Sequence, residues 1–204
     1  MTPVFLRRTL LAAAALCAAG AVYAQAVIGQ AAPALQAVDA SGKAVNLADY
    51  KGKTVVLEWV NPGCPFVKKH YGSGNMQATQ KAAAGQGVVW LTVSSTAPSH
   101  KDYQKPAELA AWMAEQKAAS TLLMDDSGTV GKAWGAKTTP HLFIVNPAGQ
   151  VVYNGAIDSK PSANPADIPG ATNYVTAALG ELKAGQPIAK ASTQPYGCSI
   201  KYAS

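Results

Sequence analysis

One segment, from Thr54 to Tyr71, constrains the fold of this chain more than any other. Thr54 to Val60 is apolar on both alternating faces except at Glu58, and such a strand is usually central in its sheet and covered on both sides. Asn61 to Gly63 follows as a turn, and Cys64 then opens a helix. A thiol at a helix N-terminus meets unpaired backbone N–H groups and the positive end of the helix dipole, which favour the thiolate. The segment therefore predicts redox chemistry at Cys64.

Turn residues and hydrophobic periodicity divide the rest of the chain into further strands and helices. The pattern predicts an N-terminal β-hairpin, then strands alternating with helices, and finally a second hairpin and a helix. This alternation implies a mostly parallel sheet with right-handed crossovers, to which the final hairpin adds an antiparallel edge. The expected class is an α/β sandwich with helices on both faces. The predicted strands are 35–39, 44–47, 54–60, 88–93, 121–124, 141–145 and 150–155; the predicted helices are 65–71, 75–84 capped by Asn75, 106–119, one capped by Asp126 or Ser127 that ends at 134, and 174–183; a surface loop is predicted over 158–170.

The first 24 residues are typical of a secretory signal peptide. Arg7 and Arg8 form a positive region, Thr9 to Ala21 is apolar, and Ala24 is a small residue before the expected cleavage site. The apolar run is shorter than the roughly 20 residues of a membrane span, although an uncleaved anchor is the alternative. We therefore expect a periplasmic or secreted protein. The predicted division is a signal peptide over 1–24, a domain over 25–185, and a C-terminal tail over 186–204.

The charge pattern does not indicate binding to nucleic acid. The chain has 17 Lys and Arg against 11 Asp and Glu, and without Arg7 and Arg8 the balance is 15 against 11. This excess is mild and scattered, with no basic run, and it indicates an ordinary solvated surface. No segment after residue 24 is apolar enough to span a bilayer, so we expect no stable membrane insertion of the processed chain.

The cysteines are more informative. Of the three, Cys17 lies in the expected signal peptide, which leaves Cys64 and Cys198. An even pair in an oxidising compartment is typical of a disulfide. The sequence does not show that the two residues meet. An intramolecular bridge, an intermolecular pairing and a free thiol at Cys198 therefore all stay open.

The motifs resemble the thioredoxin superfamily, in its redoxin or AhpC/TSA branch (alkyl hydroperoxide reductase and thiol-specific antioxidant). The resemblance covers about Ile28 to Lys183, and it depends on the Cys64 segment, on Thr139 and Pro140 before a strand, and on the 146–149 hairpin. The helix and strand between 106 and 124 are similar to the insertion that separates redoxins from minimal thioredoxins. The resemblance implies a thioredoxin-like three-layer α/β/α sandwich that needs no cofactor. It also implies that Pro140 is a cis-proline facing the sulfur, with Thr139 beside it.

The chain departs from the family patterns at three positions. Val67 stands where a thioredoxin has the second cysteine of Cys-x-x-Cys, so a local dithiol is absent. Asn61 replaces the Thr or Ser three positions before a peroxidatic cysteine, and peroxide reduction loses its usual hydroxyl partner. Lys68 stands at the second cysteine of copper-handling relatives, which argues against a thiolate copper pair. Peroxiredoxins often keep a resolving cysteine near the C-terminus, and we hypothesise that Cys198 resolves or bridges Cys64.

Two charged residues are predicted to support Cys64. Lys68 lies one helical turn after the thiol and is expected to add the positive potential that lowers a thiol pKa. Glu58 is the one polar residue in an apolar strand. If it is buried near the turn, its pKa is raised and it can accept a proton during thiol chemistry. The alternative for Glu58 is a strand-end carboxylate paired with a lysine.

Aromatic residues near Cys64 are interpreted as packing. Trp59 and Phe66 are predicted to form an apolar wall around the sulfur. Tyr71 is interpreted as a packing residue, and His70 as a surface histidine, because the sequence groups no other metal ligands with it.

The leading functional prediction is a thiol–disulfide oxidoreductase of redoxin type. Cys64 would attack a protein disulfide or a peroxide, Cys198 would resolve the product, and an external thiol would recycle the disulfide. One alternative is a peroxiredoxin-like peroxidase with antioxidant activity. Another is a non-catalytic protein of the same fold, in which a Cys64–Cys198 bridge holds the tail in place.

Overall fold

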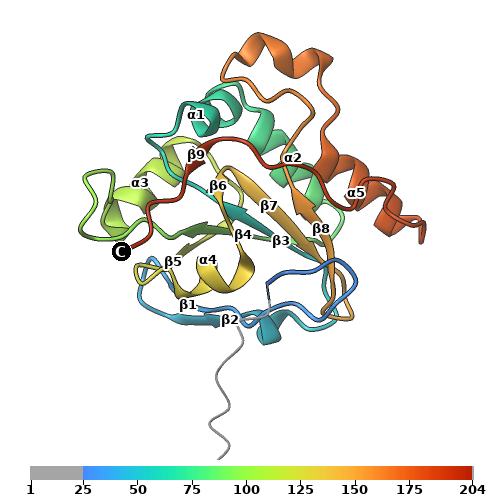
Figure 1. Cartoon of the computed structure of the whole chain (residues 1–204), viewed down its shortest axis with the longest axis horizontal. Coiled ribbons are helices and arrows are strands. Elements are labelled where there is room, and N and C mark those ends of the chain that lie inside the picture. Colours follow the sequence, from blue (N-terminus) through green and yellow to red (C-terminus); the bar gives the residue numbers. More distant parts are fainter. Residues whose placement is uncertain (1–24, 204) are drawn as a thin grey trace, which may run out of the picture.

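A seven-stranded mixed sheet forms the centre of the molecule in the computed structural model, which describes residues 25–203 (Figure 1). The predicted signal peptide lies outside the described residues. Both predicted hairpins and all of the predicted strands are present. The order across the sheet is β2 (Ala44–Asn46), β1 (Gln36–Asp39), β5 (Thr121–Met124), β4 (Val89–Ser94), β3 (Val55–Trp59), β7 (His141–Val145) and β8 (Val151–Gly155).

The prediction of a mostly parallel sheet is wrong. Only β3, β4 and β5 run parallel to one another, and every other pairing in this sheet is antiparallel. The cause lies in the connection after β5, which is α4 (Thr129–Trp134), a helix of six residues. Such a helix rises about 9 Å, whereas a five-residue strand spans about 17 Å. The chain therefore does not return to the start of the sheet, and β7 begins at His141 opposite Trp59, where β3 ends.

Helices cover one face of the sheet with a large apolar cluster (Figure 1). Because side chains alternate along β3, Val56 and Val60 point to this face. They pack with Met76 and Val175 from the helices, and each fully buried apolar side chain stabilises the fold by roughly 1.5–3 kcal/mol. The covering helices are α1 (Pro65–Gly72), α2 (Asn75–Ala84) and α5 (Tyr174–Lys183).

A second apolar cluster lies on the opposite face, beneath α4. Trp134 of α4 packs against Trp59 and Phe143, with ring centroids 6.2 and 5.4 Å away. Helix α3 (Pro106–Glu115) forms a third, smaller cluster through Leu109 and Met113 with β5. Helices therefore lie on both faces of the sheet, as the sequence predicted.

Helix boundaries differ from the predicted ones where glycine or a positive φ intervenes. Asn75 is the first residue of α2 and not its cap, which is Gly74 at a φ of 79°. The cap of α4 is Gly128, and Asp125 accepts hydrogen bonds from backbone N–H groups of the first turn. Helix α3 ends at Glu115, before the predicted residue 119, because Lys117 adopts a positive φ of 54°. Two short 3-10 helices are η1 (Leu47–Tyr50) and η2 (Pro165–Gly170), the second inside the predicted surface loop.

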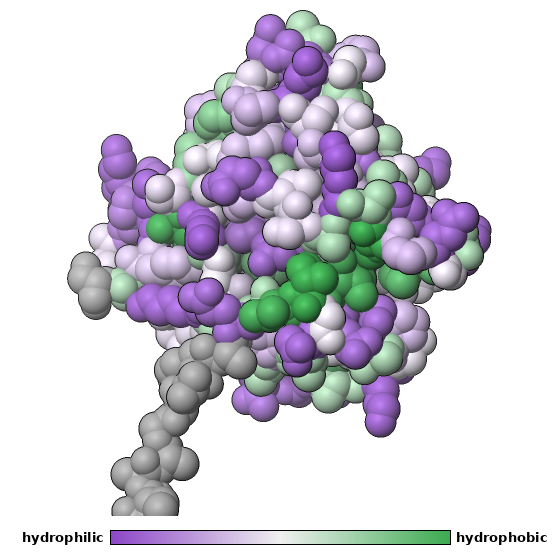
Figure 2. All heavy atoms as spheres, turned by 45° about the vertical axis from the view of Figure 1, so that its right-hand side comes forward, coloured by the Kyte–Doolittle hydropathy of each residue, from purple (hydrophilic) through white to green (hydrophobic). Residues whose placement is uncertain are grey.

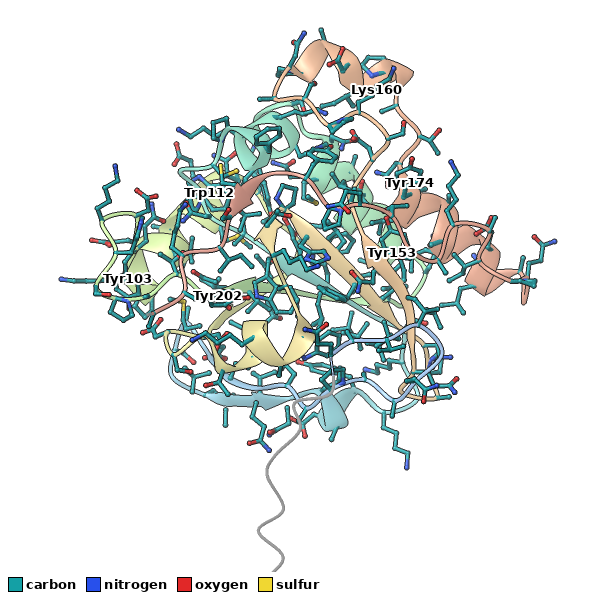
Figure 3. All side chains as sticks on the ribbon, in the orientation of Figure 1. Tyr103, Trp112, Tyr153, Lys160, Tyr174 and Tyr202 are labelled. Carbon is teal, nitrogen blue, oxygen red and sulfur yellow. The ribbon has the colours of Figure 1, made fainter. Side chains whose placement is uncertain are left out.

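The C-terminal tail is a docked part of the fold. It runs along the same side as α1 and α5 and contains β9 (Cys198–Ser199), which pairs antiparallel with β6 (Thr138–Thr139) (Figure 1). The Thr193 N–H donates to Asn154 O, and the Ile200 N–H donates to Lys137 O. Figure 3 shows Tyr202 above α4, where its hydroxyl donates to Ala136 O. These contacts place residues near both ends of the tail on the domain.

Among residues 25–203, no helix has the length and apolar character needed to cross a bilayer. Figure 2 shows a face on which hydrophilic residues and residues of intermediate hydropathy dominate, with its largest hydrophobic patch near the lower centre of the view. The exposed large hydrophobic side chains of the described residues are Val27 and Val38.

Candidate active site

Cys64 lies at the N-cap of α1, after the short turn that follows the carboxyl end of β3. Its backbone is extended, and Pro65 takes the first helical position, where no N–H is needed. The turn before it is ordered by Asn61, whose side-chain oxygen accepts the Gly63 N–H at 2.8 Å and whose carbonyl accepts the Cys64 N–H at 3.0 Å. Asn61 therefore shapes the turn that carries the sulfur.

The tail brings Cys198 to this sulfur. In the β6–β9 pair Cys198 lies opposite Thr139, and the Cys198 backbone N–H donates to Cys64 Sγ at 3.4 Å. The Cys64 thiol in turn donates to Thr139 O at 3.0 Å. The Thr139–Pro140 peptide is cis, as the family resemblance implies. Two cysteines 134 positions apart are thus neighbours, and both are free thiols in this structure.

The two thiols have opposite pKa shifts. Burial raises the pKa of Cys64, but hydrogen bonds from the Cys198 side chain and the Val67 backbone N–H outweigh it, and the net pKa is lowered. Burial and the neighbouring Cys64 together raise the pKa of Cys198 to about 11. Cys64 is therefore the thiol that ionises first, and Cys198 keeps its proton.

Only a small cleft opens beside the two sulfurs. It has a volume of about 130 Å³, and polar groups from Asn61, Thr96, Asp102 and Lys201 line it together with the cysteines. The side chain of Cys64 itself is 3% exposed, because the tail covers it. A larger cavity of about 560 Å³ lies at the other end of β3, beside Val55, and does not include either cysteine.

Lys68, Trp59 and Phe66 were each predicted to lie near Cys64, and the structure places them differently relative to it. Lys68 is exposed on α1, and the groups that lower the pKa of Cys64 are hydrogen-bond donors rather than this ammonium. Trp59 lies on the opposite face of the sheet from Cys64, where its Nε1 donates to Ser95 Oγ at 3.0 Å, so it is not part of a wall around the sulfur. The reason is strand alternation, which points residues 58 and 59 to opposite faces. Phe66 is half-buried and packs edge-on against Tyr196 of the tail at 5.7 Å.

Glu58 is fully buried on the face that carries Cys64. Its Oε2 accepts hydrogen bonds from Trp90 Nε1 at 2.8 Å and from the Tyr71 hydroxyl at 3.1 Å, with longer ones from Gln80 and Thr92. Its Oε1 has no hydrogen-bond partner among the described residues. Burial raises the pKa of this carboxyl to about 7, although the four donors oppose the rise. The alternative of a lysine-paired carboxylate is therefore wrong, since these partners are neutral.

Comparison with known families identifies the family of this chain. The family model described as AhpC/TSA family matches residues 28–154, more than half of the chain. The chain belongs to the AhpC/TSA family. No curated protein matches the sequence of this AhpC/TSA protein.

Solved structures show the same fold. The AhpC/TSA protein is similar to a hypothetical protein from Sinorhizobium meliloti 1021, with 22% identity, a TM-score of 0.74, and coverage of 87% of this chain and 96% of that one. It is similar to the thioredoxin domain of a thiol-disulfide oxidoreductase from Bacteroides vulgatus, at 24% identity and a TM-score of 0.51, over 71% and 96% of the two chains. A thiol:disulfide interchange protein from Bacteroides sp. has 26% identity and a TM-score of 0.51, over 63% and 80%. The thioredoxin-like α/β fold expected from the sequence is confirmed.

The structure also reveals a buried polar group that sequence reasoning missed. We call Lys69, His70, Asp158 and Tyr196 the Asp158 cluster. Lys69, His70 and Asp158 are each at most 3% exposed, so the interpretation of His70 as a surface histidine is wrong. Nothing in the sequence separates Lys69 from the exposed Lys68, and Asp158 lies in a segment whose Pro and Asn content predicts a loop. Within residues 25–203, no three His, Cys, Asp or Glu side chains gather as a metal site.

The raised pKa of Glu58 in this AhpC/TSA protein predicts a pH dependence of stability. Its pKa is about 7 in the folded chain against 4.5 for a solvated glutamate, so the folded state binds this proton more tightly. The contribution of this carboxyl to the free energy of unfolding is fully present below pH 4.5. It falls by about 3 kcal/mol as the pH rises to 7. Urea unfolding should show that, between pH 4.5 and 7, the free energy of unfolding of the wild type falls by about 3 kcal/mol relative to that of Glu58→Gln, whose amide has a similar size.

Comparing the wild type with Glu58→Gln separates the effect of Glu58 on stability from that of the buried histidines. Burial lowers the pKa of His70 and of His141 to about 4, so these groups destabilise the fold as pH falls and have the opposite slope. Both histidines are retained in Glu58→Gln. Parallel stability curves for the two proteins between pH 4.5 and 7 would contradict the assignment.

Proposed function

We propose that this AhpC/TSA protein is a thiol–disulfide oxidoreductase, with Cys64 as the nucleophile and Cys198 as the resolving cysteine. The observation that carries the proposal is the contact of the Cys198 backbone N–H with Cys64 Sγ at 3.4 Å. The opposite pKa shifts assign the two roles, because the thiolate is the attacking species. Similarity to a thiol:disulfide interchange protein from Bacteroides sp. supports the same class of reaction.

The reaction consists of two exchanges at Cys64. The Cys64 thiolate attacks one sulfur of a substrate disulfide, the substrate S–S bond breaks, and one substrate sulfur leaves as a thiolate. Cys198 then loses its proton and attacks Cys64 Sγ in the mixed disulfide. The Cys64–Cys198 bond forms and the second substrate thiol is released. An external dithiol returns two electrons and two protons, which restores both free cysteines.

Cys198 needs a proton acceptor for the second exchange, because its pKa is about 11. We propose Glu58 for this role. Its pKa of about 7 lets it exchange a proton near neutral pH, and its Oε1 carries no other hydrogen bond from the described residues. Glu58 and Cys64 lie on the same face of the sheet, beneath α1. Thr139 and Pro140 fix the opposite side of the sulfur, through the Thr139 carbonyl.

We propose protein disulfides as substrates. A cleft of about 130 Å³ is smaller than the roughly 300–1,000 Å³ of pockets that enclose a small ligand. A substrate disulfide therefore has to be presented from outside, at the molecular surface. The predicted signal peptide supports a periplasmic or secreted location, where disulfides persist.

An activity assay tests the proposal directly. The protein from residue 25 onward is expected to reduce insulin or a scrambled disulfide protein in the presence of an external dithiol. Hydrogen peroxide and an organic hydroperoxide, assayed with the same reductant, are expected to be consumed slowly, because Asn61 provides no hydroxyl at the family position. Rapid peroxide consumption without disulfide turnover would overturn the proposal.

Membership of the AhpC/TSA family favours peroxide reduction as the second candidate. In that reaction the Cys64 thiolate attacks the peroxide O–O bond, forming a sulfenic acid and releasing water or an alcohol. Cys198 then condenses with the sulfenic acid and releases water.

The non-catalytic alternative is tested by the reduction potential of the Cys64–Cys198 bridge. Structural disulfides tend to lie below about −300 mV, so a potential in that range would favour a structural role.

A further inference from the structure

The Asp158 cluster joins three segments that are far apart in the sequence. Lys69 and His70 come from α1, Asp158 precedes the loop that contains η2, and Tyr196 lies in the tail two residues before Cys198. Figure 3 shows the segment around Lys160 standing above the tail on the same side of the molecule as α1. Tyr196 is therefore the one member of the cluster on the segment that carries the second cysteine.

Hydrogen bonds in the cluster converge on the Tyr196 hydroxyl. This hydroxyl donates to Asp158 Oδ1, and His70 Nε2 lies 3.1 Å from the same hydroxyl oxygen. Asn75 Nδ2 donates to His70 Nδ1 at 2.8 Å, so Nδ1 is an acceptor and the ring proton is assigned to Nε2. The resulting chain runs from His70 through Tyr196 to Asp158 in one direction.

Lys69 contacts both Asp158 and the ring of Tyr196. Its ammonium lies 3.5 Å from Asp158 Oδ2, donates to Lys160 O at 2.9 Å, and lies 5.5 Å from the centre of the Tyr196 ring. A lysine is almost never fully buried without a partner, and here the ammonium is paired with Asp158 and stacked on Tyr196. The ring itself packs on Phe66. Removal of the tail would break the hydrogen bonds of the Tyr196 hydroxyl with Asp158 and His70 and the contact of its ring with the Lys69 ammonium, which opposes undocking.

Gly197 connects Tyr196 to Cys198. It adopts a φ of 142°, and its backbone lies against the carbonyl of Thr139, where a side chain would not fit. The position of the Cys198 sulfur over Cys64 is consequently fixed by Tyr196 on one side and by the β6–β9 pairing on the other.

We propose that Tyr196 is a positioning residue for the exchange between Cys64 and Cys198, acting through the hydrogen bond of its hydroxyl to Asp158. The inference rests on the proposed function, and it names the residue that positions Cys198 for the second exchange. The anchored tyrosine raises the effective concentration of the Cys198 thiol at Cys64, because it keeps β9 in place. Without the anchor, β9 can move away and this effective concentration falls.

Oxidised glutathione is the probe, because it reports both exchanges without a protein substrate. The Cys64 thiolate attacks one glutathione sulfur, releases one glutathione thiolate, and forms a Cys64–glutathione mixed disulfide. Cys198 then attacks Cys64 Sγ and releases the second glutathione, so the protein dithiol is oxidised while oxidised glutathione is reduced. Acid quenching and mass spectrometry at successive times resolve the reduced, mixed and bridged forms.

Tyr196→Phe is the test, since it keeps the ring on Phe66 and removes only the hydroxyl. Hydrogen bonds to charged groups are strong enough that we expect closure of the mixed disulfide to slow by about tenfold or more. The rate of the first exchange is expected to stay the same or to rise, because Cys64 becomes less covered. The matched control is Tyr202→Phe, which removes another tail hydroxyl that donates to Ala136 O. It is expected to close within about threefold of the wild-type rate.

The outcomes separate the inference from the proposed function. Closure at the wild-type rate in Tyr196→Phe would overturn the inference, and so would an equal slowing in both tyrosine variants, which would indicate general docking of the tail. Circular dichroism and thermal unfolding confirm that each variant is folded. If the wild type itself forms no Cys64–Cys198 bond with oxidised glutathione, the proposed function fails, and the inference that rests on it fails too.

Discussion

Replacing Cys198 with serine is expected to stop turnover after the first exchange and to leave a mixed disulfide on Cys64. Serine keeps the size of the residue and its backbone pairing with Thr139, so the tail should stay docked. The serine hydroxyl cannot take part in disulfide exchange, and the substrate is therefore not released. Non-reducing mass spectrometry, on protein reacted with substrate before any external dithiol is added, should find mixed disulfides of Cys64 with substrate at close to one per chain. Multiple-turnover insulin reduction should fall well below the wild-type rate, because only the external dithiol can then release the substrate.

The complementary variant, Cys64→Ser, defines the background. Cys198 then remains as the one thiol of residues 25–203. Burial, the largest cause of its raised pKa, still disfavours the thiolate in this variant, although the contribution of Cys64 is lost. We expect neither turnover nor a trapped adduct within the time of the assay. Full multiple-turnover activity in Cys198→Ser would show that Cys198 is not the resolving cysteine.

Replacing Gly197 with alanine is expected to displace β9 and to separate the two sulfurs. A Cβ at this position would fall on the carbonyl oxygen of Thr139, and the φ of 142° is one that residues with side chains rarely adopt. Both effects oppose the β6–β9 pairing. We expect closure of the bridge to slow by more than about tenfold, and alkylation of Cys64 by iodoacetamide to speed up, because the tail no longer covers a side chain that is 3% exposed.

Gly185→Ala is the matched control for this experiment. Gly185 also has a positive φ, of 67°, but no atom lies within 4 Å of its added Cβ, and it follows α5 rather than the sulfur. It therefore carries the backbone strain alone. Equal alkylation and closure rates in the wild type, Gly185→Ala and Gly197→Ala would show that the tail does not cover the site in solution.

The local features of the fold could be predicted because they depend on short-range patterns. The β3–turn–α1 segment follows from an apolar strand, a Pro-Gly turn and a proline at the first helical position, all within a few residues. Strand direction depends instead on where a connection ends in space. The six residues of α4 decide that β7 runs antiparallel. The sequence predicts this short helix, but alternation of strands and helices does not show that so short a connection fails to carry the chain back across the sheet.

The sequence singles out Cys64 and Cys198 as candidate site residues, and the structure brings them together, but the groups that hold them could not be predicted. Trp59 was assigned to the site by its distance along the chain, whereas alternation in the strand puts it on the far face. Lys69 is buried because Asp158 and Tyr196 happen to face it, and those residues are separated from it by most of the domain. Such tertiary pairing leaves no periodic signal, so neither its members nor its place beside the site could be predicted.

The placement of Cys198 on the tail has a consequence for the lifetime of the protein. When both cysteines of a redox pair share one helix, oxidation closes a ring of a few residues and barely changes the unfolded chain. Here the two residues are 134 positions apart, and their bond would close a loop of chain that contains β4, β5, β7 and β8. A ring of that size disfavours the unfolded state by roughly 5 kcal/mol. Reduced molecules would therefore open and be degraded sooner than oxidised ones, so that protein abundance would itself follow the redox balance of the compartment.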